Sequence, residues 1–200
     1  ELTLLQQAEE LFEKHHISKH NYSFIKDEVI SFLQKQETNS FDTILCLGIF
    51  YYVNDIVTCL NEMRRVAKEA IILDTFTAYY GASVSKEGEK ISQFAIDETY
   101  DLPMVLYPFT KSKKRDYTIC NNFVKGEKYI SIISLPTIPA FENFFNLTKL
   151  DFKLLSWEKY YSTNYFNWKD FIKTDVKYAS HWADIYYAKL RVAYLLKPQL

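Results

Sequence analysis

Apolar and polar positions follow two different periods in the middle of the chain. Residues 43–47 form an apolar run of strand length that ends at Gly48. After Asp55 the apolar residues recur at helical spacing, at Ile56, Leu60, Met63 and Ala67, and a second apolar strand at 70–73 follows directly. Strand, loop, helix and strand predict a βαβ unit. Its loop lies at the carboxyl edge of a parallel sheet, where open α/β sheets bind ligands.

The residues before this unit predict three further elements. A helix with one apolar face ends near His16, and residues 21–26 have the composition of a strand. Asp27 and Glu28 stand at the carboxyl end of that strand, and a short helix over 29–36 leads to the strand that begins at Phe41. We expect the strands near 22–26, 42–47 and 70–75 to be parallel.

The second half is less regular at first. Periodicity fades over 77–128, which we interpret as a long insertion or lid. Residues 129–135 are expected to be extended, and a helix is predicted over 137–146. Two closing strands, near 150–157 and 190–197, are expected to pair antiparallel at one edge of the sheet.

Composition and charge limit the classes of function. Two hundred residues with 48% hydrophobic content suit one globular domain. The formal charge of −1 gives no overall electrostatic case for nucleic acid or an acidic membrane. No apolar run reaches the roughly 18 residues of a membrane span, and no signal peptide is recognisable, so a cytoplasmic location is expected. Three widely spaced cysteines predict neither disulfides nor a metal site.

One long segment carries a family resemblance. FDTILCLGIFYYVNDIVTCLNEMRRV, residues 41–66, resembles the fourth-strand segment of class I S-adenosylmethionine (SAM) dependent methyltransferases. In that family a strand runs into a G-x-x-Y loop and then into a helix that reads L-x-E-x-x-R-V. Gly48, Tyr51 and Tyr52 match the loop pattern. Leu60, Glu62, Arg65 and Val66 match the helix pattern.

Three later segments continue the resemblance in the family's order. ILDTF (72–76) is similar to the fifth strand, ISLPTIPAFENFF (133–145) to the helix before the sixth strand, and RVAYLLKP (191–198) to the closing strand. The resemblance implies an α/β, Rossmann-like class I methyltransferase fold. The family's glycine-rich turn and ribose-binding acid have no counterpart in the sequence. We therefore expect residues 1–200 to form a single, N-terminally incomplete methyltransferase-type domain without its first two strands.

The resemblance implies SAM as cofactor, with no metal, and it assigns candidate residues. Asp27, with Glu28 beside it, would accept a hydrogen bond from the adenine amino group. The alternative is that these acids only cap the helix that begins at Val29, because Asp is a preferred N-cap residue. Three residues at the end of the fourth strand would face the sulfur and the methionine chain of the cofactor: Cys46, Leu47 and Gly48.

Two aromatic side chains are the candidates for catalysis. Tyr51 and Tyr52 would face the transferred methyl group, and Tyr51 would also contact the cofactor. Aromatic faces attract a cationic sulfonium, and a phenol can orient an acceptor oxygen. The alternative is ordinary packing, because the chain has 16 tyrosines. Relatives often have His where this chain has Tyr52, so a mechanism that needs imidazole there is not expected.

Three functions follow from these observations. The first is methyl transfer to an oxygen or nitrogen of a small-molecule acceptor. The second is modification of the tRNA wobble uridine, because several motifs are similar to the wobble-uridine carboxymethyltransferase group. The basic run 111–115, between Tyr107 and Tyr117, could hold RNA or could be a solvated loop. The third is a non-catalytic scaffold that kept the fold. Small-molecule substrates are favoured and tRNA is the alternative partner.

Overall fold

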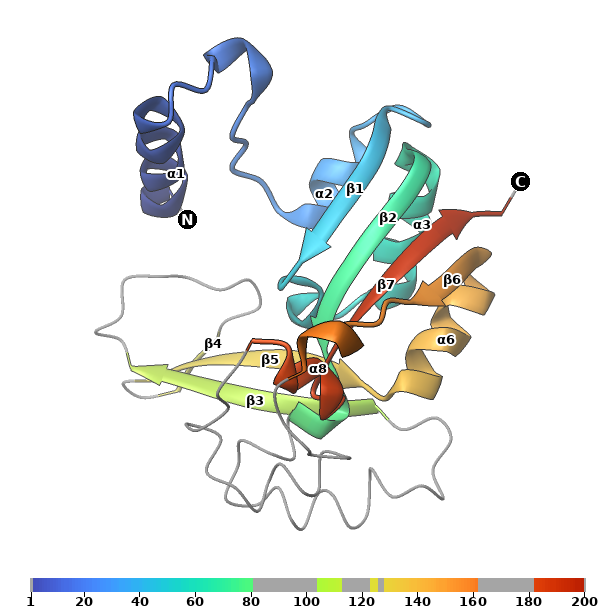
Figure 1. Cartoon of the computed structure of the whole chain (residues 1–200). Helices are drawn as coiled ribbons and strands as arrows, with labels where there is room; N and C mark the ends of the chain where they lie inside the picture. The colour runs from blue at the N-terminus through green and yellow to red at the C-terminus, as the bar shows by residue number, and fades with distance from the viewer. Residues whose placement is uncertain (1, 81–103, 113–122, 126–127, 162–181, 200) are drawn as a thin grey trace.

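The computed structural model describes residues 2–80, 104–112, 123–125, 128–161 and 182–199 (Figure 1). The strands are β1 (Phe41–Leu47), β2 (Ala67–Phe76), β3 (Met104–Ser112), β4 (Phe123–Lys125), β5 (Lys128–Pro136), β6 (Leu150–Leu154) and β7 (Arg191–Pro198). The α-helices are α1 (Leu2–Lys14), α2 (Val29–Gln34), α3 (Ile56–Val66), α6 (Ile138–Leu147) and α8 (Asp184–Tyr187). Short 3-10 turns are η1 (Lys19–Asn21), η2 (Phe50–Tyr52) and η3 (Glu158–Tyr160).

The main sheet has the strand order β1-β2-β7-β6. β1 and β2 are parallel, as predicted for a βαβ unit, and α3 connects them. β7 pairs antiparallel with both β2 and β6, which confirms the expected closing pair. The mixed α/β architecture is the Rossmann-like arrangement that the resemblance implies.

Helix α3 forms where the polar and apolar pattern predicted it. The Asp55 side chain accepts a hydrogen bond from the Thr58 backbone N–H at 3.1 Å, which satisfies one of the free donors at the start of the helix. The buried face has helical spacing and consists of Ile56, Cys59, Leu60, Met63 and Val66. Ala67, predicted as part of this face, is buried but already begins β2.

Three helices cover one face of the main sheet. The ribbons of α2, α3 and α6 lie beside the strands in Figure 1. Their side chains share a core with inward residues of the strands. Phe145 of α6 is fully buried, and its ring centroid lies 5.0 Å from that of Tyr194 on β7. On the opposite face of β1, Leu45 and Leu47 are 62% and 56% exposed. Alternation along the strand sends neighbouring side chains to these two different environments.

A second sheet was not predicted. β3, β5 and β4 form an antiparallel sheet that lies beneath the carboxyl ends of β1 and β2 in Figure 1. Residues 104–112 and 123–125, which we expected to lie in an irregular insertion or lid, are therefore strands. Leu135 of β5 is fully buried beside Ala78 and Leu190, in a second core cluster that joins the two sheets. Residues 77–80 of the expected lid are also described, and Ala78 is buried in this cluster. Residues 81–103, 113–122 and 126–127 of the expected lid lie outside the described residues.

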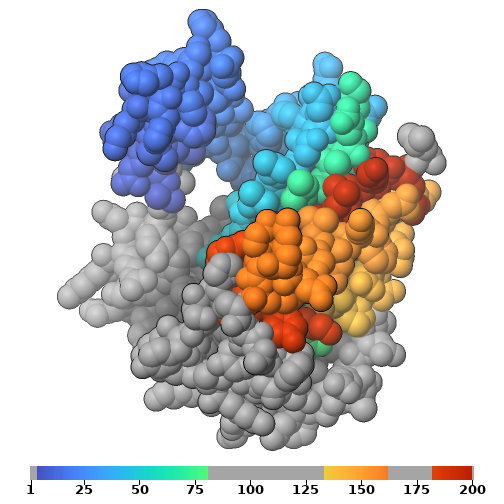
Figure 2. Space-filling model, viewed as in Figure 1, coloured from blue at the N-terminus to red at the C-terminus, as the bar shows by residue number. Residues whose placement is uncertain are grey.

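The strand expected over 21–26 is wrong. Residues 22–26 form no sheet in the described structure. Tyr22 and Phe24 instead pack their rings on Phe12 of α1, at centroid distances of 4.8 and 5.2 Å. Alternating aromatic residues can therefore pack their rings against a helix instead of forming a strand. Figure 2 shows α1 and the segment after it as a lobe that projects from the rest of the molecule.

Candidate functional site

The E-x-x-R pair of α3 fixes the position of α2. Arg65 donates from Nη1 to the Gln36 carbonyl at 2.8 Å and from Nη2 to the Leu33 carbonyl at 2.9 Å. Glu62 accepts from Nε of Arg65 at 2.9 Å, which orients the guanidinium. The arginine thus satisfies free carbonyls at the carboxyl end of α2. The opposite end of α2, where the candidate acids lie, is held relative to α3 as a result.

The two candidate acids have different local roles. Glu28 is the N-cap of α2, and its carboxylate accepts from the Ser31 N–H at 2.8 Å. Asp27 accepts from Lys35 Nζ at 2.6 Å and from the Glu28 N–H at 2.8 Å. The Lys35 hydrogen bond, helped by the Glu28 N–H, lowers the pKa of Asp27 from its usual value. Capping falls to Glu28, and the Asp27 carboxylate keeps lone pairs for another donor.

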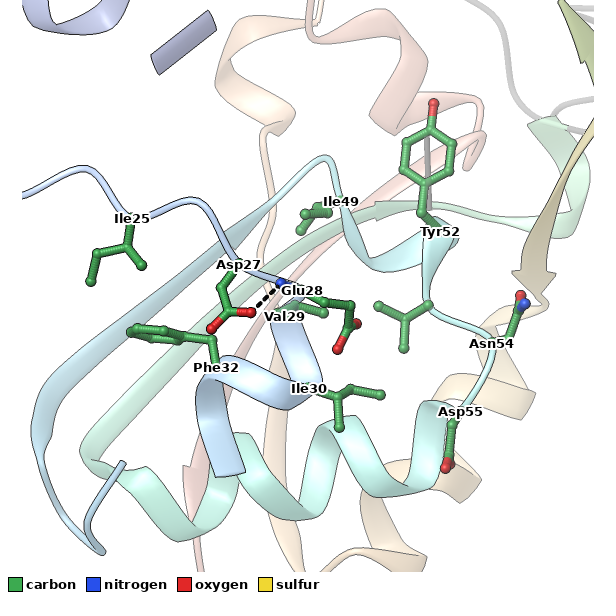
Figure 3. Close-up of a pocket in the computed structure, with 11 residues that line it drawn as sticks. Ile25, Asp27, Glu28, Val29, Ile30, Phe32, Ile49, Tyr52, Asn54 and Asp55 are labelled. Carbon is green, nitrogen blue, oxygen red and sulfur yellow. Dashed lines mark hydrogen bonds between the residues drawn. The ribbon is translucent and has the colours of Figure 1, made fainter. Parts of the chain in front are cut away.

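A cavity of about 530 Å³ joins these acids to the loop that follows β1. Apolar side chains such as Ile25, Val29 and Ile49 form much of its lining, together with the carboxylates of Asp27, Glu28 and Asp55 and the ring of Tyr52 (Figure 3). In Figure 3 the Tyr52 ring points away from Asp27. The structure therefore brings three predicted site residues, Asp27, Glu28 and Tyr52, to one cavity. Cys46, Leu47, Gly48 and Tyr51 are not part of its lining.

Gly48 makes the turn at the end of β1 possible. Its φ is +68°, a conformation that L-residues with a Cβ rarely adopt. Its N–H donates to the Asp74 carbonyl of β2 at 2.9 Å. A Cβ at this position would lie 3.3 Å from Nη2 of Arg191, so the space beside Gly48 is already narrow. The positive φ favours a glycine here, and a Cβ would require the Arg191 side chain to shift slightly.

The two residues before Gly48 point in opposite directions. Cys46 is buried in the core with α3, and burial raises the pKa of its thiol to about 12. Leu47 lies on the exposed face. Any contact of Cys46 with a ligand at this edge would therefore involve its backbone, whereas Leu47 can offer its side chain.

Tyr51 and Tyr52 lie side by side in η2. Their ring centroids are 4.5 Å apart, and Tyr51 also contacts Phe76 at 5.1 Å. Both are half-buried against the cluster that joins the two sheets. Burial, followed by the influence of Tyr52, raises the pKa of Tyr51 to about 12. At neutral pH the Tyr51 phenol is thus protonated, and a hydrogen bond with the Tyr52 side chain contributes to the raised pKa.

A polar network that the sequence analysis did not assign lies beside this turn. Asp74 is only 6% exposed; it accepts from the Tyr186 hydroxyl at 2.5 Å and from Arg191 Nε at 2.5 Å. Nη2 of Arg191 completes an ion pair with the same carboxylate. The guanidinium lies 5.0 Å from the Phe76 ring centroid. The available signal was the acid inside the apolar strand ILDTF, since a buried acid needs partners.

The described residues lack two further features. Within these ranges, no group of three or more His, Cys, Asp or Glu side chains is arranged to hold a metal ion. Among the helices of the same ranges, none has the length and apolar character needed to cross a membrane.

Comparisons with known proteins concern the fold and the family of the chain. Two similar solved structures are S-adenosylmethionine-dependent methyltransferases. The one from Clostridium acetobutylicum ATCC 824 has 14% identity and a TM-score of 0.50, covering 100% of this chain and 73% of its own. The one from Mesorhizobium loti has 12% identity and a TM-score of 0.40, covering 82% and 66% respectively. No curated protein matches the chain. A family model described as a methyltransferase domain matches residues 3–133, and the chain belongs to that family of enzymes.

Proposed function

We propose that this protein is a SAM-dependent methyltransferase that transfers a methyl group to an oxygen or nitrogen of a small-molecule acceptor. The observation that carries the proposal is the cavity at the carboxyl end of β1, lined by Asp27 and Tyr52. It lies where open α/β sheets bind ligands, in a chain that belongs to a methyltransferase family.

The lining of the cavity fits the cofactor. Its volume of about 530 Å³ falls in the usual range for small-molecule sites, roughly 300–1,000 Å³. Asp27 offers an acceptor for an adenine amino group, and apolar side chains such as Val29 and Ile49 suit the faces of a purine. The carboxylates of Asp27, Glu28 and Asp55 give the lining a negative charge, which suits a cationic sulfonium ligand. Gly48 lets the backbone beside the cavity turn without a side chain.

The reaction requires positioning more than acid–base chemistry. When bound, SAM supplies an electrophilic methyl group, and in-line alignment of an acceptor with that group accounts for much of the rate increase. The Tyr51 and Tyr52 rings would border the transferred methyl, as the resemblance implies. The Tyr51 phenol, protonated at neutral pH, can donate to an acceptor oxygen and hold it in place. A base for an acceptor proton would have to come from another group.

Replacement of Asp27 tests the cofactor site. Asp27→Ala should weaken binding of S-adenosylhomocysteine by about 1–3 kcal/mol, because a buried adenine donor loses its partner. Isothermal titration calorimetry measures the affinity. Asp42→Ala is the matched control, since the Asp42 side chain is 79% exposed on β1 and does not line the cavity. Equal affinity for Asp27→Ala and the parent would remove Asp27 from the site, and a parent that does not bind S-adenosylhomocysteine would refute the proposed function.

A second measurement separates the two possible roles of the tyrosine pair. Tyr51→Phe removes the phenol but keeps the ring that contacts Phe76. If Tyr51 orients the acceptor, this variant loses turnover and keeps its affinity for S-adenosylhomocysteine. The tRNA alternative stays a prediction, because most of the basic run 111–115 lies outside the described residues.

A further inference from the structure

A second cavity has Arg191 in its lining. It has a volume of about 240 Å³ and opens between β6, the start of β7 and α8. Its lining includes Ser156, Tyr161, Tyr187, Lys189 and Arg191. None of the candidate cofactor residues contributes to it. Its volume suits a ligand much smaller than a nucleoside cofactor.

The charged groups that line this cavity are both basic. Lys189 is exposed and has no carboxylate partner within the described ranges. Arg191 uses Nε and Nη2 on Asp74, and its Nη1 has no hydrogen-bond partner there either. A guanidinium has five N–H donors, so Arg191 can bind Asp74 and a second anion together. Asp74, which balances one of the two positive charges, does not line the cavity.

The rest of the lining suits a flat apolar body. The rings of Tyr161 and Tyr187 are stacked, with centroids 4.6 Å apart and an angle of 24° between their planes. Leu154 and Leu155 add aliphatic surface. Stacked aromatic walls with a few polar groups are typical of small-molecule sites.

Lys189 is held in an uncommon backbone conformation. Its φ is +59°, in the left-handed region that residues with a Cβ rarely occupy. Its carbonyl accepts from the Thr77 hydroxyl at 2.7 Å, and its N–H donates to the Tyr186 carbonyl at 3.0 Å. The fold therefore fixes this turn between α8 and β7. His16, Asn39 and Lys149 adopt the same conformation, and at Lys189 it forms the turn that ends α8.

We propose that this cavity binds a small organic anion, with its carboxylate or phosphate on Lys189 and Arg191 and its apolar body against Tyr161 and Tyr187. The proposal rests on the proposed function in one respect: the anion is then the methyl acceptor. Arg191 also lies close to the turn that follows β1, because a Cβ on Gly48 would be 3.3 Å from its Nη2, and Ile49 after Gly48 lines the cofactor cavity. With its anionic group held by Lys189 and Arg191, the acceptor would extend its other end toward the methyl group.

Binding of simple probes tests the anion site. Benzoate and phenyl phosphate are titrated into the protein, with benzamide as the neutral analogue, and binding is followed by saturation-transfer NMR. At least one anion should bind, and benzamide should not. Lys189→Met should weaken that binding by roughly tenfold or more, because a charge-assisted hydrogen bond is lost. Lys153→Met, at an exposed lysine on the neighbouring strand that does not line the cavity, should leave the affinity unchanged.

The outcomes distinguish this proposal from the proposed function. Failure of both anions to bind, equal binding of benzamide, or equal losses in Lys189→Met and Lys153→Met would overturn the anion site. Preference for benzoate over phenyl phosphate, or the reverse, identifies the anionic group. Lys189-dependent binding in a protein that does not bind S-adenosylhomocysteine would refute the proposed function and leave the anion site standing. Normal S-adenosylhomocysteine affinity in Lys189→Met shows that the two sites are separate.

Discussion

The two faces of the main sheet differ in how far their apolar side chains are buried. On one face Phe145 of α6, Leu60 of α3 and Tyr194 of β7 are fully buried between the helices and the sheet. On the other, Leu45 and Leu47 of β1 are largely exposed, while Asp74 of β2, at the same level as Leu47, is buried. The covered face thus follows the simple apolar pattern, and the open face carries a buried charge beside exposed leucines. The difference indicates that the covered face supplies stability, whereas the open face near Asp74 holds a polar network.

The sharpest test of this comparison is a pair of truncations. Phe145→Ala should lower the free energy of unfolding by about 3–5 kcal/mol, because it leaves a cavity in the covered core. Leu45→Ala should change it by less than about 1 kcal/mol, since that side chain is 62% exposed. Urea denaturation measures both. Comparable losses for the two variants would contradict the assignment of stability to the covered face.

The buried charge on the open face gives the next largest effect. Tyr186→Phe removes a donor from the Asp74 carboxylate and should cost about 1.5–3 kcal/mol of stability. Tyr187→Phe is the matched control on the same helix, because no hydrogen bond of its hydroxyl is found in the described structure. If the two variants have the same melting temperature, the Tyr186 hydroxyl contributes little to the stability of the network.

Gly48 allows a finer separation of backbone and contact effects. Gly48→Ala should destabilise by about 1–2 kcal/mol, because a Cβ is unfavourable at positive φ, and it should also displace Arg191. Gly48→Asn tolerates the left-handed backbone better but still meets Arg191. If contact with Arg191 dominates, the two variants will be equally destabilised. If Gly48→Asn is clearly more stable than Gly48→Ala, the positive φ is the main reason for a glycine at this position.

The smallest expected effect concerns Lys35 and Asp27. Lys35→Met should raise the pKa of Asp27 toward its usual value, which a carboxyl-detected NMR titration measures. The folded-state pKa is the lower one, so the stability this pair contributes is present above the usual pKa of Asp and is lost as the pH falls through the folded value. The stability difference between parent and variant should therefore vanish in acid. An unchanged Asp27 pKa would show that Lys35 is not its main partner.

Local patterns predicted the covered face well. Ile56, Leu60 and Met63 recur at helical spacing, and they are buried where α3 packs on the sheet. Tyr22 and Phe24 do not form the predicted strand, because alternating aromatic residues can pack against a helix as well as within a sheet. The second sheet was not predicted for a related reason: β3 contains Pro108 and ends with three polar residues, Thr110, Lys111 and Ser112, so its apolar period is broken.

The site was predictable only where its residues lie close in sequence. Asp27 and Glu28 precede α2, and Gly48 to Tyr52 follow β1, so each group was visible as a local motif. The Asp74 network joins residues 112 and 117 positions apart. Nothing in the spacing of the chain indicates such a pairing, since it depends on β7 lying beside β2. The resemblance of the last strand includes Arg191 but gives it no partner.

The reactivity of the two buried cysteines can report how often the core between α3 and β1 opens. Burial raises the pKa of both the Cys46 and the Cys59 thiols, and only the thiolate reacts readily with alkylating reagents. Both thiols are free, and they lie on facing elements of the same core. In a Cys120→Ser background, their rate of alkylation should follow the fraction of molecules in which α3 has separated from β1. Addition of S-adenosylhomocysteine should slow that rate in proportion to ligand occupancy.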